Sequence, residues 1–178
     1  MSDEALMIQL RDGDLASAAI LYERWKRSLF NYFYRLSGDE SGSEDLTQMV
    51  FERLIKYRTS YKEGMLFKAW VFQIARNVHH TAYKKRSNKL VTLNELNAYE
   101  GSEAPLEYQI EQQEEKEALW QAMDQLTPEQ REILLFTKFQ KIPYKEVGEM
   151  LNCTEGAVKV KVHRAIASLR LLYFKMGK

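Results

Sequence analysis

The segment from Phe67 to Asn88 mixes aromatic and basic side chains in a way that suits nucleic acid. If it forms a helix, one side presents Phe72, Arg76, His80 and Tyr83, with Lys84 beside them. Residues 67–90 include six Lys or Arg and no Asp or Glu. Aromatic rings stack on unpaired bases and cations attract phosphate, so this face predicts a surface for single-stranded nucleic acid.

A second basic cluster lies near the start of a helix expected from Glu155. Residues 131–178 contain ten Lys or Arg and four Glu. Gly156 and Ala157 are small enough for the helix backbone to approach DNA closely. The side chains expected to face DNA beyond them are Lys159, Val160, Lys161, His163 and Arg164, with the cations on phosphates or bases and Val160 near thymine methyl groups.

Catalytic and metal-binding patterns are lacking from the sequence. It contains no carboxylate pair, nucleophile with a base, or phosphate loop, so an enzyme is disfavoured and no cofactor is expected. His79 and His80 are adjacent and point about 100° apart on a helix, which disfavours shared metal binding. The single Cys153 excludes an internal disulfide and fits a reducing cytoplasm.

The second basic cluster is expected on a helix-turn-helix. Thr127-Pro-Glu-Gln130 is a capping box that predicts a helix to about Phe139. A second helix should begin at Pro143 and end at Asn152-Cys153, and Thr154 should cap a third. The expected packing side of this third helix comprises Val158, Val162, Ala165, Ile166, Leu169 and Leu172. A short helix, a short turn and a longer basic helix are typical of major-groove binding.

The N-terminal half is expected to form four helices. Their expected ranges are 5–10, 14–36, 41–57 and 67–88, with a loop over 58–66. A capping box, Ser41-Gly-Ser-Glu44, should open the third. In the fourth, the expected packing side comprises Phe67, Val71, Ile74, Ala75, Val78 and Ala82, with Trp70 at its edge.

Composition predicts an all-α protein of two small helical domains. The chain has 178 residues, of which 45% are hydrophobic, and a net charge of +1. Periodicity is lost after the first basic block, which predicts an N-terminal domain at 1–88, a flexible linker at 89–105 and a helix-turn-helix domain at 106–178. The chain has no apolar run of about eighteen residues and an acidic start, so neither a membrane span nor a signal peptide is expected.

Two stretches in this order resemble bacterial sigma factors, in particular the extracytoplasmic-function group. Residues 126–135, 144–151 and 156–165 resemble the helices of the C-terminal sigma domain. Residues 67–77, with Trp70, Ile74-Ala-Arg-Asn77 and the trailing Lys84-Lys-Arg86, resemble the helix that melts and reads the minus-ten promoter element. Residues 44–51 resemble the motif that docks on the largest polymerase subunit.

The resemblance implies a role for each matching residue. Asp45 and Gln48 would contact core RNA polymerase, while Leu46 and Phe51 would pack inward. The minus-ten element of promoter DNA would be bound by Tyr61, Lys62, Met65, Trp70, Phe72, Arg76, Asn77, His80, Tyr83, Lys84, Lys85 and Arg86. The minus-thirty-five duplex would be read by Glu155, Gly156, Ala157, Lys159, Val160, Lys161, His163 and Arg164. Thr81, Gly148 and Val160 depart from the family pattern and leave the DNA preference open.

The expected function is therefore that of a non-enzymatic sigma factor acting in the cytoplasm. Its expected partners are core RNA polymerase, promoter DNA and an anti-sigma factor, without membrane insertion. A stand-alone helix-turn-helix regulator that binds duplex DNA as a dimer is the main alternative, and it predicts a palindromic site bound without polymerase. A third alternative, a pure interaction protein, predicts no salt-dependent affinity for DNA.

Overall fold

The computed structural model describes residues 1–88 and 106–177, with side chains for 1–87 and 113–177. The described residues form helices joined by turns and contain no strand, so the predicted all-α class is confirmed. Contacts along the chain divide it into two compact units, Met1–Glu95 and Leu96–Lys178. The predicted linker at 89–105 lies outside the described residues, and the domain limits therefore stay predictions.

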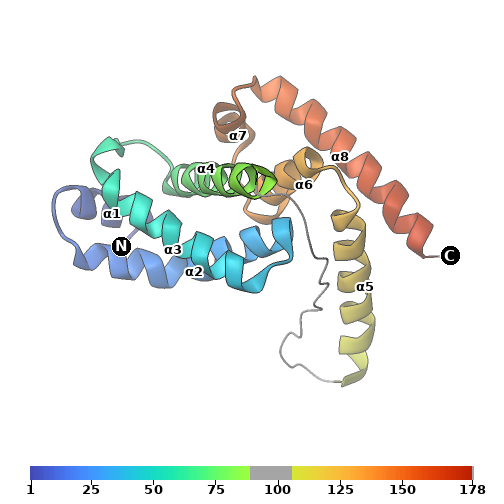
Figure 1. Ribbon diagram of the computed structural model, residues 1–178. Helices are drawn as coiled ribbons and strands as arrows, with labels where there is room; N and C mark the ends of the chain where they lie inside the picture. Colours follow the sequence, from blue (N-terminus) through green and yellow to red (C-terminus); the bar gives the residue numbers. More distant parts are fainter. Residues whose placement is uncertain (89–105, 178) are drawn as a thin grey trace. The chain divides into compact units, whose positions relative to one another are not determined.

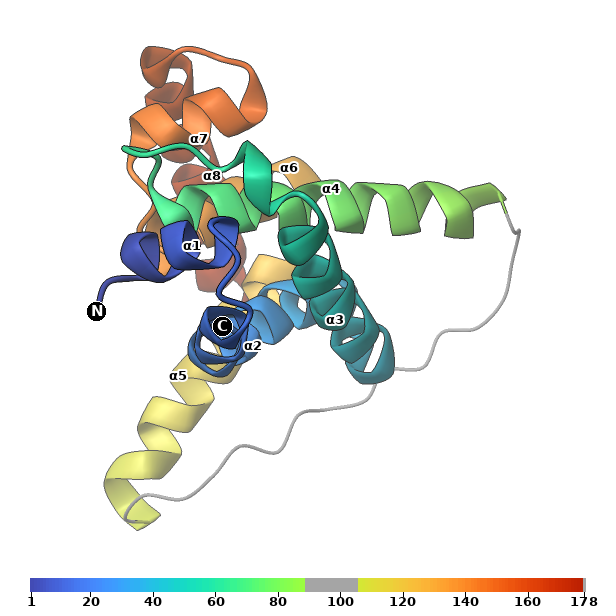
Figure 2. The same ribbon diagram turned by 90° about the vertical axis from the view of Figure 1, so that its left-hand side faces the viewer.

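The first unit is a bundle of helices (Figure 1), and its core contains several buried aromatic side chains. Its elements are α1 (Asp3–Arg11), α2 (Ala16–Ser37), α3 (Glu40–Lys56), the 3₁₀ turn η1 (Arg58–Ser60) and α4 (Phe67–Asn88). The long α2 and α3 run side by side, and α4 packs across them (Figure 2). Trp25 of α2 lies edge-on to Phe67 and Phe72 of α4, with ring centroids 5.7 and 6.2 Å apart.

The start of α3 differs from its sequence prediction. The predicted capping box at Ser41–Glu44 is wrong, because α3 already begins at Glu40 and its cap is Asp39. The Asp39 carboxylate accepts a hydrogen bond from the Gly42 N–H at 2.9 Å. Ser43 is fully buried inside the first turn, where its hydroxyl donates to the Asp39 carbonyl at 2.6 Å. The Asp39 side chain, two residues before the predicted cap, therefore satisfies one free backbone donor of the first turn.

The second unit contains α5 (Leu106–Asp124), α6 (Pro128–Leu134), α7 (Tyr144–Leu151) and α8 (Glu155–Met176). The predicted cap at Thr127 is confirmed: Thr127 Oγ1 accepts from the Gln130 N–H at 3.3 Å, and Gln130 Oε1 accepts from the Thr127 N–H at 3.4 Å. Helix α6 continues into a π-helical turn, Leu135–Phe139, that the sequence pattern did not predict. There the Gln140 N–H bonds to the Leu135 carbonyl at 2.9 Å.

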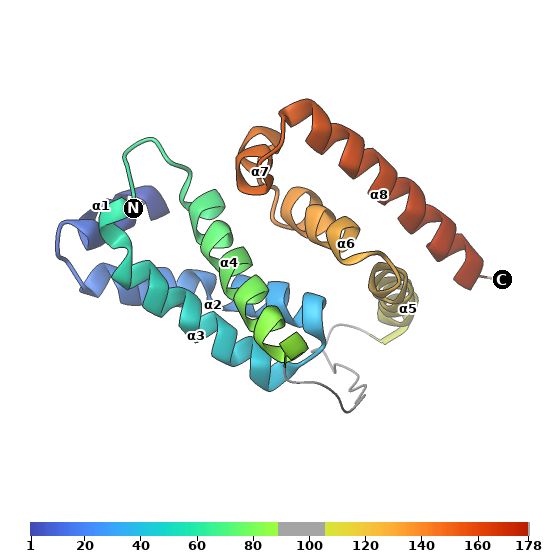
Figure 3. The same cartoon turned by 45° about the horizontal axis from the view of Figure 1, so that its top comes forward.

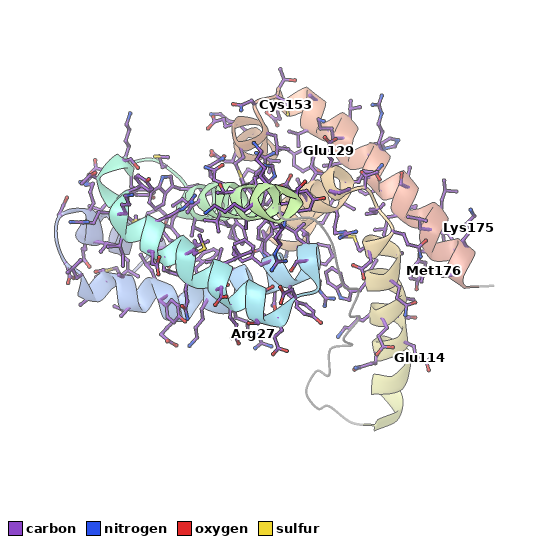
Figure 4. The ribbon with its side chains drawn as sticks, viewed as in Figure 1. Arg27, Glu114, Glu129, Cys153, Lys175 and Met176 are labelled. Atoms are coloured by element: carbon purple, nitrogen blue, oxygen red, sulfur yellow. The ribbon has the colours of Figure 1, made fainter. Side chains whose placement is uncertain are left out.

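The helix-turn-helix of the second unit is formed by α7, a three-residue turn and α8 (Figure 3). Asn152 adopts a left-handed conformation, with φ at +52°, and ends α7. Thr154 Oγ1 then accepts from the Ala157 N–H at 3.1 Å and begins α8, as predicted. Figure 4 labels Cys153 in this turn, and Lys175 and Met176 near the far end of α8.

Among the described residues, every helix is too short or too polar to cross a lipid bilayer.

Candidate nucleic-acid interface

The outer face of α4 carries most, but not all, of the predicted nucleic-acid contacts. Asn77, His80 and the basic run Lys84–Arg86 are exposed, and Tyr83 is 67% exposed. Arg76 is half-buried. Because the sequence of α4 contains no acid, no carboxylate of its own helix offsets the attraction of these cations for phosphate.

The prediction that Phe72 faces a base is wrong. Its side chain is fully buried, and its ring lies against Tyr32 and Trp25 of α2, 5.4 and 6.2 Å away between centroids. Helix α4 packs against both α2 and α3, so it buries a wider arc than a helix that covers a single neighbour. Phe72 therefore supports the helix from within.

Trp70 lies at the edge of the packing arc, as expected from the sequence. The side chain is half-buried, and its ring meets Tyr61 edge-on at 5.2 Å and Phe67 at 6.4 Å. One part of the indole therefore packs and the rest reaches solvent beside the loop before α4.

Tyr61 was expected to contact the minus-ten element, but its side chain is buried at the centre of the loop before α4. The side chain is 1% exposed, and its hydroxyl donates to the Met65 carbonyl at 2.6 Å. Burial, helped by the nearby carboxylates of Glu4 and Asp3, raises the pKa of Tyr61 to about 12. Tyr61 therefore remains a neutral donor that fixes the loop.

The other two predicted loop residues remain at the surface. Lys62 is exposed and Met65 is half-buried. The Lys62 N–H lies 3.3 Å from the Met65 sulfur, which closes the loop on itself. A base that reached this loop would meet the Met65 thioether and the Lys62 ammonium, with the buried Tyr61 beneath them.

His79 is half-buried, a placement that was not predicted from the sequence. Its ring lies nearly parallel to those of Phe33 and Tyr83, with centroids 6.5 and 6.4 Å away. Burial, with smaller contributions from the positive charges of His80 and Arg86, lowers the pKa of His79 to about 4. Its spacing from Phe72 and Ala75 was the available signal, because all three fall on one arc of a helix. The exposed Tyr83 ring thus lies nearly parallel to a neutral imidazole.

The predicted polymerase-facing residues lie together on the outside of α3. Asp45 and Gln48 are exposed and, three positions apart, share one face. Phe51 is buried against Tyr22 of α2, with ring centroids 4.9 Å apart, and Leu46 is half-buried. The division between outer polar and inner apolar residues on this helix agrees with the sequence prediction.

The start of α8 also presents the side chains expected there. Val158, Val162 and Ala165 are buried, and Ala157 is half-buried. The exposed set comprises Glu155, Gly156, Lys159, Val160, Lys161, His163 and Arg164. One helix face thus packs while the other offers cations, small residues and an apolar Val160 that is 49% exposed. Such a surface can meet phosphates and base edges in a major groove.

Gly148 allows α7 to approach the turn closely. A Cβ at this position would lie 2.7 Å from the Cys153 carbonyl oxygen, which is closer than real side chains come. The same two residues share a hydrogen bond of 2.9 Å from the Cys153 N–H to the Gly148 carbonyl. The glycine therefore sets how tightly the turn folds against α7.

Two family descriptions match the two halves of the chain. "Sigma-70 region 2" matches residues 21–89, and "Sigma-70, region 4" matches residues 116–169. Curated relatives of the extracytoplasmic-function (ECF) group match across both regions. The chain belongs to the ECF sigma factors.

The relatives of this ECF sigma factor come from distant bacteria. BldN of Streptomyces coelicolor, an ECF RNA polymerase sigma factor, is 29% identical over 96% of this chain and 67% of its own length. EcfG of Rhodopseudomonas palustris is 29% identical over 84% of this chain and 81% of its own. SigM of Bacillus subtilis is 28% identical over 86% and 93%.

Solved structures have the same fold. The sigma factor RpoE of Bartonella quintana, crystallised with the anti-sigma factor NepR, superposes with a TM-score of 0.71 at 22% identity. The match covers 86% of this ECF sigma factor and 94% of that chain. CnrH, in complex with the cytosolic domain of CnrY, gives a TM-score of 0.70 at 19% identity, over 96% of each chain.

Membership of the family gives the chain its function. As a sigma factor, it binds core RNA polymerase and directs promoter-specific initiation of transcription. The exposed faces of α3, α4 and α8 are the parts of the described structure whose side chains suit those two tasks.

Proposed function

We propose that the two units of this sigma factor divide promoter recognition between them. The first unit docks on core polymerase through Asp45 and Gln48 and holds the opened minus-ten strand on α4. The second unit reads the minus-thirty-five duplex with the start of α8. The observation that carries the proposal is the outer face of α4, where exposed His80 and Tyr83 lie among cations on a helix whose sequence has no acid.

The contacts of α4 favour a single strand over a duplex. Tyr83 presents a ring that is 67% exposed, and an unpaired base can stack on such a ring. Stacking of a base on such a ring is worth about 1–3 kcal/mol. Lys84 and Lys85 follow directly and would hold the adjoining phosphates, while Arg86 next to them is paired with Asp39.

The contacts of α8 favour a duplex. Gly156 and Ala157 leave the first turn almost bare, so the backbone of the helix can enter a groove. Lys159, Lys161 and Arg164 lie beyond that turn and can reach phosphates or guanine edges. Replacing Ala157 with Glu puts a carboxylate at the point of closest approach, so it should abolish duplex recognition.

We also propose that the protein performs no catalysis of its own, acts in the cytoplasm and is controlled by an anti-sigma factor. The last point is supported by two structures with this fold. RpoE was crystallised with the anti-sigma factor NepR, and CnrH is in complex with the cytosolic domain of CnrY. Control by an anti-sigma factor is tested by purifying the chain from its host with its bound proteins, before and after transcription from its promoters is induced. A partner lost on induction is the expected result.

The proposed function is tested with purified chain and core polymerase on a promoter library, read as run-off transcription. The expected result is initiation from a limited set of sequences, lost in Ala157→Glu while the variant still binds polymerase. A chain that ignores polymerase and binds an inverted repeat as a dimer would overturn the proposal.

A further inference from the structure

The first turn of α4 obtains its cap from a distant helix. Leu66 precedes α4 and has no side-chain acceptor, and the first turn contains no acid. Instead, Glu4 Oε1 of α1 accepts a hydrogen bond from the Phe67 N–H at 3.2 Å, across 63 residues of sequence. The carboxylate also lies at the positive end of the helix dipole, where negative charge is favourable.

Helix α1 is itself fastened to α2, so Glu4 is held in place. Asp3 accepts from Arg24 Nη1 at 2.8 Å with one carboxylate oxygen, and from Trp25 Nε1 at 3.1 Å with the other. The Trp25 ring in turn lies against Phe67, the residue that Glu4 caps. The apolar side of α1, formed by Leu6, Met7 and Leu10, is buried.

The last turn of α4 is held by another carboxylate from outside the helix. Arg86 Nη2 donates to Asp39 Oδ2 at 2.8 Å, while Asp39 Oδ1 caps α3 through the Gly42 N–H at 2.9 Å. Figure 3 shows this end of α4 beside the turn between α2 and α3. A Cβ on Gly42 would lie 2.8 Å from Asp39 Cγ and 3.1 Å from Arg86 Nη2, so the junction has no room for a side chain there.

The Asp39 carboxylate keeps its charge in this junction. The Gly42 N–H, and after it Arg86, hold the pKa of Asp39 below its ordinary value. One ionised group therefore joins the beginning of α3 to the end of α4.

We propose that Glu4 and Asp39 are positioning residues for promoter opening, which anchor the first and last turns of α4 so that the exposed residues between them face the separated strand. Both carboxylates come from other elements and contact only the two ends of the helix, whose own sequence contains no acid. The inference rests on the proposed role of α4 in minus-ten capture.

Conservative variants of Glu4 and Asp39 distinguish loss of an anchoring contact from simple loss of negative charge. Glu4→Gln keeps an oxygen that can accept from the Phe67 N–H, whereas Glu4→Ala removes it. Asp39→Asn keeps the cap on Gly42, because Asn caps helices as well as Asp does, but loses the ion pair with Arg86. Glu23→Ala is the matched control, because Glu23 is an exposed acid of α2 paired with Lys26.

The experiment uses holoenzyme assembled from the full chain and core polymerase. The probe is a promoter that the wild-type holoenzyme has selected from a random library, with 2-aminopurine in its minus-ten element to report strand opening. The expected loss for Glu4→Ala is about fivefold in the equilibrium between closed and open complex, the effect of one helix cap. Glu4→Gln should recover most of it, and Asp39→Asn should lose up to about fivefold, the upper range of an exposed ion pair.

A promoter whose minus-ten element is already mismatched provides the decisive comparison. If Glu4 and Asp39 position α4 for opening, both variants should transcribe this template as well as wild type and bind core polymerase equally. Equal opening of the fully paired promoter by Glu4→Ala, Asp39→Asn and wild type would overturn the inference. So would an equal loss on both templates, which would indicate a general defect of the fold.

Failure of the inference is distinguishable from failure of the proposed function. If wild-type holoenzyme opens no promoter, the proposed function is wrong. If wild type opens its promoter, but the variants open the paired promoter equally well or lose activity equally on both templates, the two carboxylates are not positioning residues. Should Glu4→Ala fail to fold, Asp39→Asn and Glu4→Gln still decide, because each retains the local backbone hydrogen bond.

Discussion

The neutral imidazole of His79 links the stability of the first unit to pH. Its pKa is lowered to about 4 in the folded protein, against an ordinary value near 6.5. The unfolded chain therefore binds a proton more readily as the pH falls through that window, and the free energy of unfolding should decrease. Allowing for partial exposure of the ring, we expect a loss of about 2 kcal/mol between pH 7 and pH 4.5.

Urea unfolding of the full chain at these two pH values measures this loss. His79→Gln should lower the pH dependence, because the amide does not titrate. His163→Gln, which removes an exposed histidine from α8, should leave it as in wild type. An unchanged dependence in His79→Gln would contradict the assignment.

Arg164 is the residue of α8 whose replacement separates base reading from phosphate binding. Bidentate contact of its guanidinium with guanine would be worth about 1–3 kcal/mol, so Arg164→Ala should weaken binding by that amount and relax preference at one base pair. Competition binding of the holoenzyme with single-substituted promoters measures both effects. Arg170→Ala removes an exposed cation further along α8 and is the control. Uniform weakening across all sequences would assign Arg164 to phosphate.

Residue exposure was predicted correctly at the start of α8 and wrongly at the beginning of α4. The outward residues of α8, from Lys159 to Arg164, follow from periodicity alone. Phe72 and Tyr61 do not, because α2 and α1 bring Trp25, Tyr32 and Glu4 against the same end of α4, and such contacts across 40 or more positions leave no local signal. Glu4 and Asp39 escaped prediction for the same reason.

At the scale of the elements, Gly148 controls the joint between α7 and α8. Gly148→Ala gains helix propensity, but the new Cβ meets the Cys153 carbonyl, and a backbone atom cannot move aside cheaply. We expect a net destabilisation of about 1–3 kcal/mol, as for other overpacked sites.

Urea unfolding of Gly148→Ala against Gly156→Ala tests this expectation. A Cβ on Gly156 would meet nothing closer than Thr154 Oγ1 at 3.9 Å, so its stability should be unchanged or raised by up to about 1 kcal/mol. Equal stability of the two variants would show that the turn yields easily.

Element boundaries were predictable where the signal is local. Thr127 and Thr154 cap their helices as expected, because a side-chain oxygen reaches backbone donors three residues away. The start of α3 was placed too late, since Asp39 and Ser41 are both good caps and packing of Ser43 decides between them. The π-helical turn at Leu135–Phe139 was not predictable, because its residues show no break in the apolar pattern expected of an α-helix.

At the scale of the whole molecule, a net charge of +1 conceals strong segregation of charge along the sequence. Lys84 and Lys85 belong to the acid-free stretch, and each phosphate they neutralise should release a counterion. Lys84→Gln with Lys85→Gln should therefore reduce the slope of log affinity against log salt by about 2 for holoenzyme on its promoter.

The control for this slope is Arg27→Gln, which removes an exposed cation of α2 and is labelled in Figure 4. Filter binding over a range of salt concentrations measures all three proteins. An equal slope for the double variant and wild type would mean that α4 does not contact phosphates.

The two-domain organisation was predictable because the loss of helical periodicity is visible in the sequence, whereas the domain limits at 88 and 106 stay predictions.

The hydroxyl of Tyr61, tied to the Met65 carbonyl beneath the loop before α4, has a consequence for binding. A segment that is already ordered loses little conformational entropy when it closes on a partner. If a nucleotide of the opened strand reaches this loop, binding should require little rearrangement of the protein. Tyr61→Phe removes the hydrogen bond to the Met65 carbonyl, so the loop would have to become ordered each time a nucleotide binds.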